Sequence, residues 1–293
     1  MIKIELEKEY LERIKLDYLF QLNKKKFYKT TKNIIHNYWI CNKDRIITAK
    51  PDTFQDIIEE FKALDQSGLD EFKTYMENQY KKKIDKYWLM KVLNIRTCPY
   101  CNRQYTFTIE KEKVVGVDKK TICPQFDHFY PQSKYPYLAL SFYNLIPSCS
   151  ICNYVKHTKI IDENLNPYLN GFGDECKFVL RDKNLKQPAV IDKKNIEVDF
   201  TPENKNIAVF GLKELYSEHT DYIEEIIDKA QAYNATYYDS LIQSFSGLGK
   251  TPAEIDRYIW GNYLETAKHD KRPLSKLTRD VLEQIGIITP TDF

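Results

Sequence analysis

Two pairs of cysteines constrain this chain more than any other feature of its sequence. Cys98-Pro-Tyr-Cys101 and Cys149-Ser-Ile-Cys152 both have the spacing C-x-x-C, which lets two thiolates from one tight turn bind the same tetrahedral ion. The two turns together supply four thiolates, so we predict a structural zinc site with no open coordination position. The alternatives are four unrelated buried cysteines or one redox pair beside a bystander pair, and the presence of both pairs disfavours them.

The rest of the composition indicates a folded chain without a membrane segment. Its 293 residues are 42% hydrophobic and 29% charged, which excludes a disordered chain and allows about two domains. Charged residues interrupt the N-terminal apolar run, and no later stretch reaches the ~18 apolar residues of a membrane span. The odd number of cysteines, seven, argues against a disulfide framework. We therefore expect a cytoplasmic protein.

Hydrophobic periodicity divides the chain into three regions. Residues 1–94 have helical spacing, as in Phe54, Ile57, Ile58 and Phe61, and residues 181–293 are also mainly helical. Residues 95–180 contain short alternating runs between Pro and Cys residues, and the runs at 105–109 and 114–117 indicate a hairpin. We predict an α+β fold in which a zinc-stapled core lies between mainly helical regions.

Polar residues between and after the cysteine pairs form an ordered motif. Asp127-His128-x-x-Pro131 is followed by Asn144, and Cys152 is followed by Asn153 and, three residues later, by Lys156. Taken in order, D-H-x-x-P, an asparagine and C-x-x-C-N-x-x-K resemble the HNH, or ββα-metal, nucleases over roughly residues 98–157. The resemblance implies a zinc-stapled ββα-metal module that hydrolyses phosphodiester bonds.

The resemblance also implies roles for individual residues. Asp127 would be the first ligand of a catalytic divalent ion, His128 the general base, and Asn144 the residue that pins the loop carrying the histidine. Asn153 would be the second metal ligand. Many relatives have histidine at this position, and an amide oxygen is a harder ligand that favours Mg²⁺ or Mn²⁺. A neutral imidazole suits the base, since its usual pKa is about 6.5.

Several residues keep two interpretations at the level of sequence. His157 follows Asn153 by four residues and would share its helix face, either as a third ligand or phosphate contact or as a solvated side chain. Lys156 is either a phosphate anchor or a solvated charge. Cys41, Cys123 and Cys176 have no partner at ligand spacing, and we expect them to be small core residues.

Basic residues gather in three runs. They lie at Lys24–Lys26, at Lys81–Lys83, and at Lys268, Lys271, Arg272, Lys276 and Arg279. Such runs beside a nuclease core would follow a phosphate backbone, although solvated helix faces explain them equally well. The net charge is only +2, so a surface for nucleic acid has to be a local patch.

These observations predict a metal-dependent endonuclease that acts on nucleic acid, most directly DNA, with weak sequence preference. A partner would have to restrain such an enzyme. Paired bacterial anti-phage defence systems that couple an ATPase to an HNH subunit, the Septu type, suggest a partner ATPase. The alternative function is a non-catalytic zinc module that binds nucleic acid or a protein, which would explain the cysteines but not the order of Asp127, His128, Asn144 and Asn153.

Overall fold

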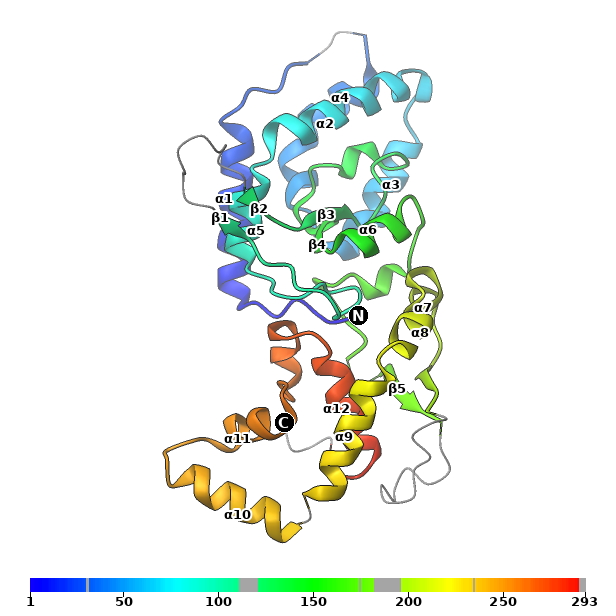
Figure 1. Ribbon diagram of the computed structural model, residues 1–293. Helices are drawn as coiled ribbons and strands as arrows, with labels where there is room; N and C mark the ends of the chain where they lie inside the picture. The colour runs from blue at the N-terminus through cyan, green and yellow to red at the C-terminus, as the bar shows by residue number, and fades with distance from the viewer. Residues whose placement is uncertain (30–31, 111–120, 174, 182–195, 234, 290–293) are drawn as a thin grey trace, which may run out of the picture. The chain divides into compact units, whose positions relative to one another are not determined.

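The computed structural model describes residues 1–29, 32–110, 121–173, 175–181, 196–233 and 235–289 (Figure 1). Within these ranges the chain is mostly helical and has three two-stranded antiparallel sheets, so the expected mixture of helices and strands is present. Strand β1 (Ile109–Glu110) pairs with β2 (Thr121–Ile122), whereas the strand expected at 114–117 lies outside the described residues. Across the described residues, no helix has the length and apolar character needed to cross a membrane.

The chain divides into two compact units, each made of segments that are separated in the sequence. The N-terminal unit consists of Ile4–Ile95 and Thr106–Leu169, and the C-terminal unit of Met1–Lys3, Arg96–Tyr105 and Asn170–Phe293. The regions expected at residues 1–94, 95–180 and 181–293 stay a prediction of the sequence, and side chains join segments that belong to different regions. In the N-terminal unit, for example, Trp39 Nε1 donates a hydrogen bond of 2.9 Å to the Tyr137 carbonyl oxygen.

Five helices and one strand pair with its helix form most of the N-terminal unit. The helices are α1 (Lys8–Asn23), α2 (Ile34–Thr48), α3 (Phe54–Lys62), α4 (Leu69–Lys83) and α5 (Lys86–Leu93). The apolar stripe that predicted α3 is buried, with Phe54, Ile57, Ile58 and Phe61 each at most 2% exposed. Asp85 caps α5 by accepting a hydrogen bond from the Trp88 N–H. The helical prediction for this region is confirmed.

Two antiparallel strands followed by a helix lie inside this unit (Figure 1). Strand β3 (Gln125–His128) pairs with β4 (Leu145–Ser148), so that Asp127 is opposite Ile146 and His128 is opposite Leu145. Helix α6 (Ser150–Lys156) begins directly after β4, because Cys149 is its N-cap residue and accepts a bond from the Cys152 N–H. Helix α6 contacts β3. The polar motif of the sequence is thus carried on three adjacent elements.

The C-terminal unit contains one strand pair and six helices within the described ranges. These elements are β5 (Lys177–Leu180), β6 (Val198–Thr201), α7 (Lys205–Phe210), α8 (Leu212–Ser217), α9 (Thr220–Ala232), α10 (Ala235–Ser246), α11 (Pro252–Trp260) and α12 (Ser275–Gln284). Helix α9 buries Ile223, Ile226 and Ile227 on one face. The helical prediction is confirmed here too.

The basic run near the C-terminus is only partly on the surface. Lys276 is 3% exposed and pairs with Asp280, while Arg279 is 2% exposed and donates a hydrogen bond to Thr266 Oγ1. Both charges belong to the buried face of α12, so neither the phosphate-binding nor the solvated interpretation holds for these two residues. Their paired partners were not visible in the sequence, because burial of α12 depends on contacts with distant segments such as β5.

Candidate functional site

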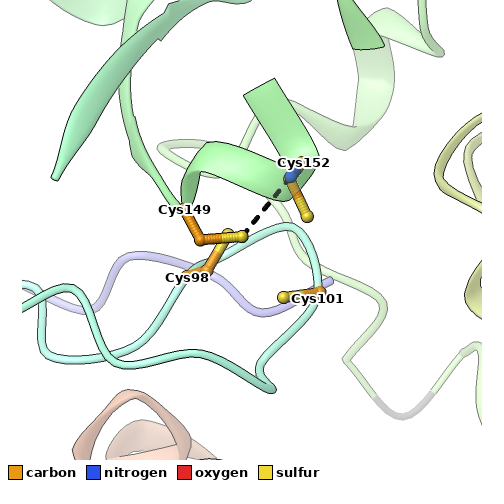
Figure 2. A group of neighbouring side chains, drawn as sticks. All are labelled: Cys98, Cys101, Cys149 and Cys152. Carbon is orange, nitrogen blue, oxygen red and sulfur yellow. Dashed lines mark hydrogen bonds between the residues drawn. The ribbon is translucent and has the colours of Figure 1, made fainter. Parts of the chain in front are cut away.

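The four cysteines of the two C-x-x-C pairs converge on one point (Figure 2). The sulfur atoms of Cys98, Cys101, Cys149 and Cys152 all lie within 4.8 Å of one another, and all four residues are buried. A tetrahedral zinc ion with Zn–S bonds of 2.3 Å separates its sulfurs by about 3.8 Å. The cluster is therefore close enough to bind a metal ion, as the spacing predicted.

Backbone donors already support two of these sulfurs. The Cys152 N–H donates to Cys149 Sγ at 3.4 Å, drawn as the dashed line in Figure 2, and the Arg103 N–H donates to Cys101 Sγ at the same distance. Such bonds favour the thiolate form that a metal requires. A site of four soft thiolates fits zinc and leaves no position for substrate, so these residues fit a structural rather than a catalytic ion.

A separate pocket of about 570 Å³ opens over β3 and α6. Among its lining residues are Asp127, His128, Asn153 and His157, so the structure brings together four of the residues singled out by the sequence. Glu77 of α4 and Gln125 of β3 also line it.

His128 is held in a defined orientation and protonation state. Its Nε2 lies 3.0 Å from the Ala139 carbonyl oxygen. A carbonyl oxygen only accepts hydrogen bonds, so Nε2 carries the proton and the lone pair of the neutral ring lies on Nδ1. Burial, aided by the positive charges of Lys156 and Lys86, lowers the pKa of His128 to about 4, against the opposing effect of the bond to Ala139. His128 is thus a neutral imidazole at pH 7.

Asp127, which lines the pocket, forms a buried ion pair with Lys156. Lys156 Nζ lies 3.0 Å from Asp127 Oδ2 and 3.2 Å from Oδ1, and it also donates to the His128 carbonyl oxygen at 2.6 Å. The Lys156 side chain is 0% exposed. The solvated interpretation of Lys156 is therefore wrong, and its ammonium faces the Asp-His pair rather than a bound phosphate. The structure gives Lys156 a positioning role that the sequence did not suggest.

Asn144 ties together the loop that follows β3. Its side-chain oxygen accepts from the Tyr130 N–H at 2.7 Å, and its amide donates to the carbonyl oxygens of Tyr130 and Leu138 at 3.1 and 2.9 Å. Asn144 is 0% exposed and does not line the pocket. All its hydrogen-bonding groups are used to hold the loop between His128 and Ala139, the segment that fixes the imidazole.

Asn153 presents one polar atom to the pocket. Its amide nitrogen donates to Gln125 Oε1 at 2.5 Å, which leaves the carbonyl oxygen as the atom that can accept or ligate. His157 differs from expectation in conformation, because α6 ends at Lys156 and His157 follows as its C-cap with φ +45°. Its exposed ring still lines the pocket and contacts Thr158 Oγ1 at 3.3 Å.

The pocket is not a ready-made cluster of charged metal ligands. Among the described residues, the four cysteines form the one group of three or more His, Cys, Asp or Glu side chains close enough to share an ion. An ion in the pocket would therefore have one carboxylate, Asp127, and the amide oxygen of Asn153, and would take its remaining ligands from water or substrate. Few hard oxygen ligands fit Mg²⁺ or Mn²⁺ better than zinc.

Sequence reasoning missed the side chains of α4 and α5 that surround His128. The ring of Tyr80 packs on His128 with centroids 4.6 Å apart, and Lys86 Nζ lies 4.2 Å from the centroid of the same Tyr80 ring. Tyr80 and His128 are far apart in the sequence, so no local pattern could have joined them.

The three cysteines outside the cluster differ in burial. Cys176 is buried as expected, whereas Cys41 and Cys123 are exposed and are not core residues.

No family model matches the chain, and no curated protein or solved structure does.

Proposed function

We propose that this protein is a metal-dependent endonuclease of the HNH kind that hydrolyses phosphodiester bonds, and that its substrate is DNA. One observation carries the proposal. His128, neutral and with Nε2 bonded to Ala139, lines the same pocket as Asp127 and Asn153. The order of these residues in the sequence, with two strands followed by a helix, supports the same conclusion.

The residues divide the chemistry of hydrolysis between them. His128 Nδ1 accepts a proton from the attacking water, which is the role of a general base. Asp127 and the Asn153 carbonyl oxygen would hold Mg²⁺ or Mn²⁺, and the bound ion would neutralise charge that develops on the phosphate. Asn144 and Lys156 act through others: Asn144 holds the loop that carries Ala139, and Lys156 fixes the Asp127 carboxylate. The four cysteines would hold a structural zinc ion, which would fix the start of α6.

Nicking of supercoiled plasmid with Mg²⁺ or Mn²⁺ tests the proposal. We expect the wild type to nick the plasmid and His128→Ala to be slower by ~10²–10⁴, the usual cost of removing a general base. The variant should retain its zinc, because His128 is not a ligand of the cysteine site, and its circular dichroism spectrum should show that it is still folded. A wild type that cleaves neither plasmid nor RNA with either ion would favour the non-catalytic zinc module instead.

The biological setting remains part of the proposal. We propose an anti-phage role with a partner ATPase, supported by the sequence resemblance alone. Co-purification of the tagged chain from its native host, followed by ATPase assay of the eluate, tests it. Recovery of the chain without ATPase activity would argue for a nuclease that acts alone.

A further inference from the structure

Two lysine runs that are far apart in the sequence meet on the N-terminal unit. Lys24–Lys26 follow α1, and Lys81–Lys83 end α4. Lys25 Nζ donates to the Lys82 carbonyl oxygen at 2.8 Å, and Lys83 Nζ donates to the carbonyl oxygens of Lys25 and Lys26 at 2.6 and 3.0 Å. We call these six residues the lysine patch. Reciprocal bonds between the runs fix them as one surface.

The charge of the patch is not neutralised by neighbouring acids. Lys24, Lys26, Lys81 and Lys82 are exposed and form no salt bridge with any other described residue. The nearby carboxylates have other partners, since Asp44 pairs with Lys43 and Asp85 caps α5. Some lysines elsewhere in the unit do pair with an acid one turn away, as Lys62 does with Glu59 and Lys73 with Asp70.

Lys83 is the buried member of the patch, and neighbouring positive charges add to the effect of its burial. Burial, together with the neighbouring charges of Lys25 and Lys43, lowers the pKa of Lys83 to about 8. Its ammonium also lies 3.7 Å from the centroid of the Phe27 ring. A surface that concentrates ammonium groups attracts a polyanion even when the net charge of the chain is small.

The patch is joined to the candidate active site through α4. Glu77 of this helix lines the pocket, Tyr80 packs on His128, and Lys81 is the next residue along the chain. A helix rises 1.5 Å per residue, so the lysines that end α4 begin within about 5 Å, along the helix axis, of the tyrosine that touches the proposed base. A strand that enters the pocket and follows α4 towards its C-terminal end would reach the patch.

We infer that the lysine patch binds the phosphate backbone of a nucleic acid beside the bond to be cleaved. The inference rests on the proposed function for the identity of the polyanion. Each lysine that contacts a phosphate releases counterions, so the affinity should depend on salt and little on base sequence. The patch would provide most of the affinity for nucleic acid, because the pocket has few groups that could recognise bases.

Anisotropy of a fluorescein-labelled 30-base-pair duplex in EDTA tests the patch without cleavage. The test variant is Lys24→Gln/Lys81→Gln/Lys82→Gln, which leaves the structural Lys25 and Lys83 in place. The matched control, Lys8→Gln/Lys50→Gln/Lys62→Gln, removes three exposed charges elsewhere on the same unit.

We expect the patch variant to bind the duplex at least tenfold more weakly than the wild type in 0.1 M NaCl. The slope of log K against log [NaCl] should fall by about 2 to 3, close to one for each lost phosphate contact. The control should stay within twofold, with an unchanged slope. Equal losses in the two variants would show an effect of net charge alone and would overturn the inference.

Vesicles containing phosphatidylserine provide the second arm. If the patch variant lost vesicle binding but bound the duplex like the wild type, the partner would be an anionic membrane and the inference would be wrong. Failure of the nuclease proposal is distinguishable, because it would appear as intact plasmid in Mg²⁺ and not as a change in duplex binding in EDTA.

Discussion

The ammonium of Lys156 lies 3.0 Å from one carboxylate oxygen of Asp127 and 3.2 Å from the other, with neither side chain more than 3% exposed. The same ammonium bonds the His128 carbonyl oxygen. One side chain at the end of α6 thus holds two consecutive residues of β3. This contact fixes the helix against the strand that carries the proposed metal ligand and base.

Removing this ammonium should destabilise the N-terminal unit. In Lys156→Met the Asp127 carboxylate would be buried without its partner, and breaking a buried ion pair in this way costs about 3–5 kcal/mol. Urea unfolding measures the loss. The double variant Lys156→Met/Asp127→Asn should recover part of it, since no charge is then left unpaired. The exposed Lys159→Met is the matched control and should unfold like the wild type. An equally stable Lys156→Met would show that the pair contributes nothing.

Local patterns predicted those features that depend on local contacts. The spacing of Cys98–Cys101 and Cys149–Cys152 predicted the cluster because each pair is one turn of backbone. The stripe on α3 predicted burial because one face of a helix is buried as a whole. The positions of Asp127 and Asn153 in one pocket followed from the order of the motif.

The features that were missed depend on contacts between distant segments. Lys156 gave no sign of burial, because its partner lies on β3, 29 residues earlier in the chain. Tyr80 reaches His128 only after α4 packs beside the strands. Each of the two compact units is likewise assembled from segments separated in the sequence.

Metal analysis should find about one zinc per chain, bound through thiolates. Cys98→Ser or Cys149→Ser should lower the zinc content to near zero and lower the melting temperature, because a structural zinc ion contributes folding free energy directly. Cys41→Ser is the control, since Cys41 is exposed and outside the cluster. Well-folded wild-type protein without zinc would rule out the structural role of the cluster.

The proposed catalytic ion should be bound weakly, and its affinity should depend on Gln125. Activity should disappear in EDTA and return with Mg²⁺ or Mn²⁺, because the pocket offers few protein ligands. Gln125 Oε1 accepts from the Asn153 amide nitrogen and so directs the carbonyl oxygen of Asn153. We expect Gln125→Ala to raise the Mg²⁺ concentration for half-maximal nicking by about 10-fold, as for other residues that orient a metal ligand. Titration of the nicking rate with MgCl₂ measures this, with Gln55→Ala as an exposed control. Full cleavage in EDTA would contradict the metal-dependent mechanism.

His269 should make the stability of the C-terminal unit depend on pH. Burial, together with the positive charges of Lys276 and Arg279, lowers the pKa of His269 to about 3, while a backbone bond to Leu264 opposes the shift. In the unfolded chain His269 takes up a proton near pH 6.5, whereas in the folded chain it does so only near pH 3. The contribution of this histidine to the stability of the folded state is therefore fully present above pH 6.5 and is lost as the pH falls from 6.5 towards 3. One buried neutral histidine contributes about 1.4 kcal/mol per pH unit over that range. The buried carboxyls of Asp270 and Asp280, whose pKa values burial raises, remain in both proteins that we compare. Urea unfolding at pH 7.5 and pH 5.5 should therefore show a smaller loss for His269→Gln than for the wild type, by about 1 kcal/mol. Equal losses in the two proteins would mean that His269 takes up its proton without unfolding.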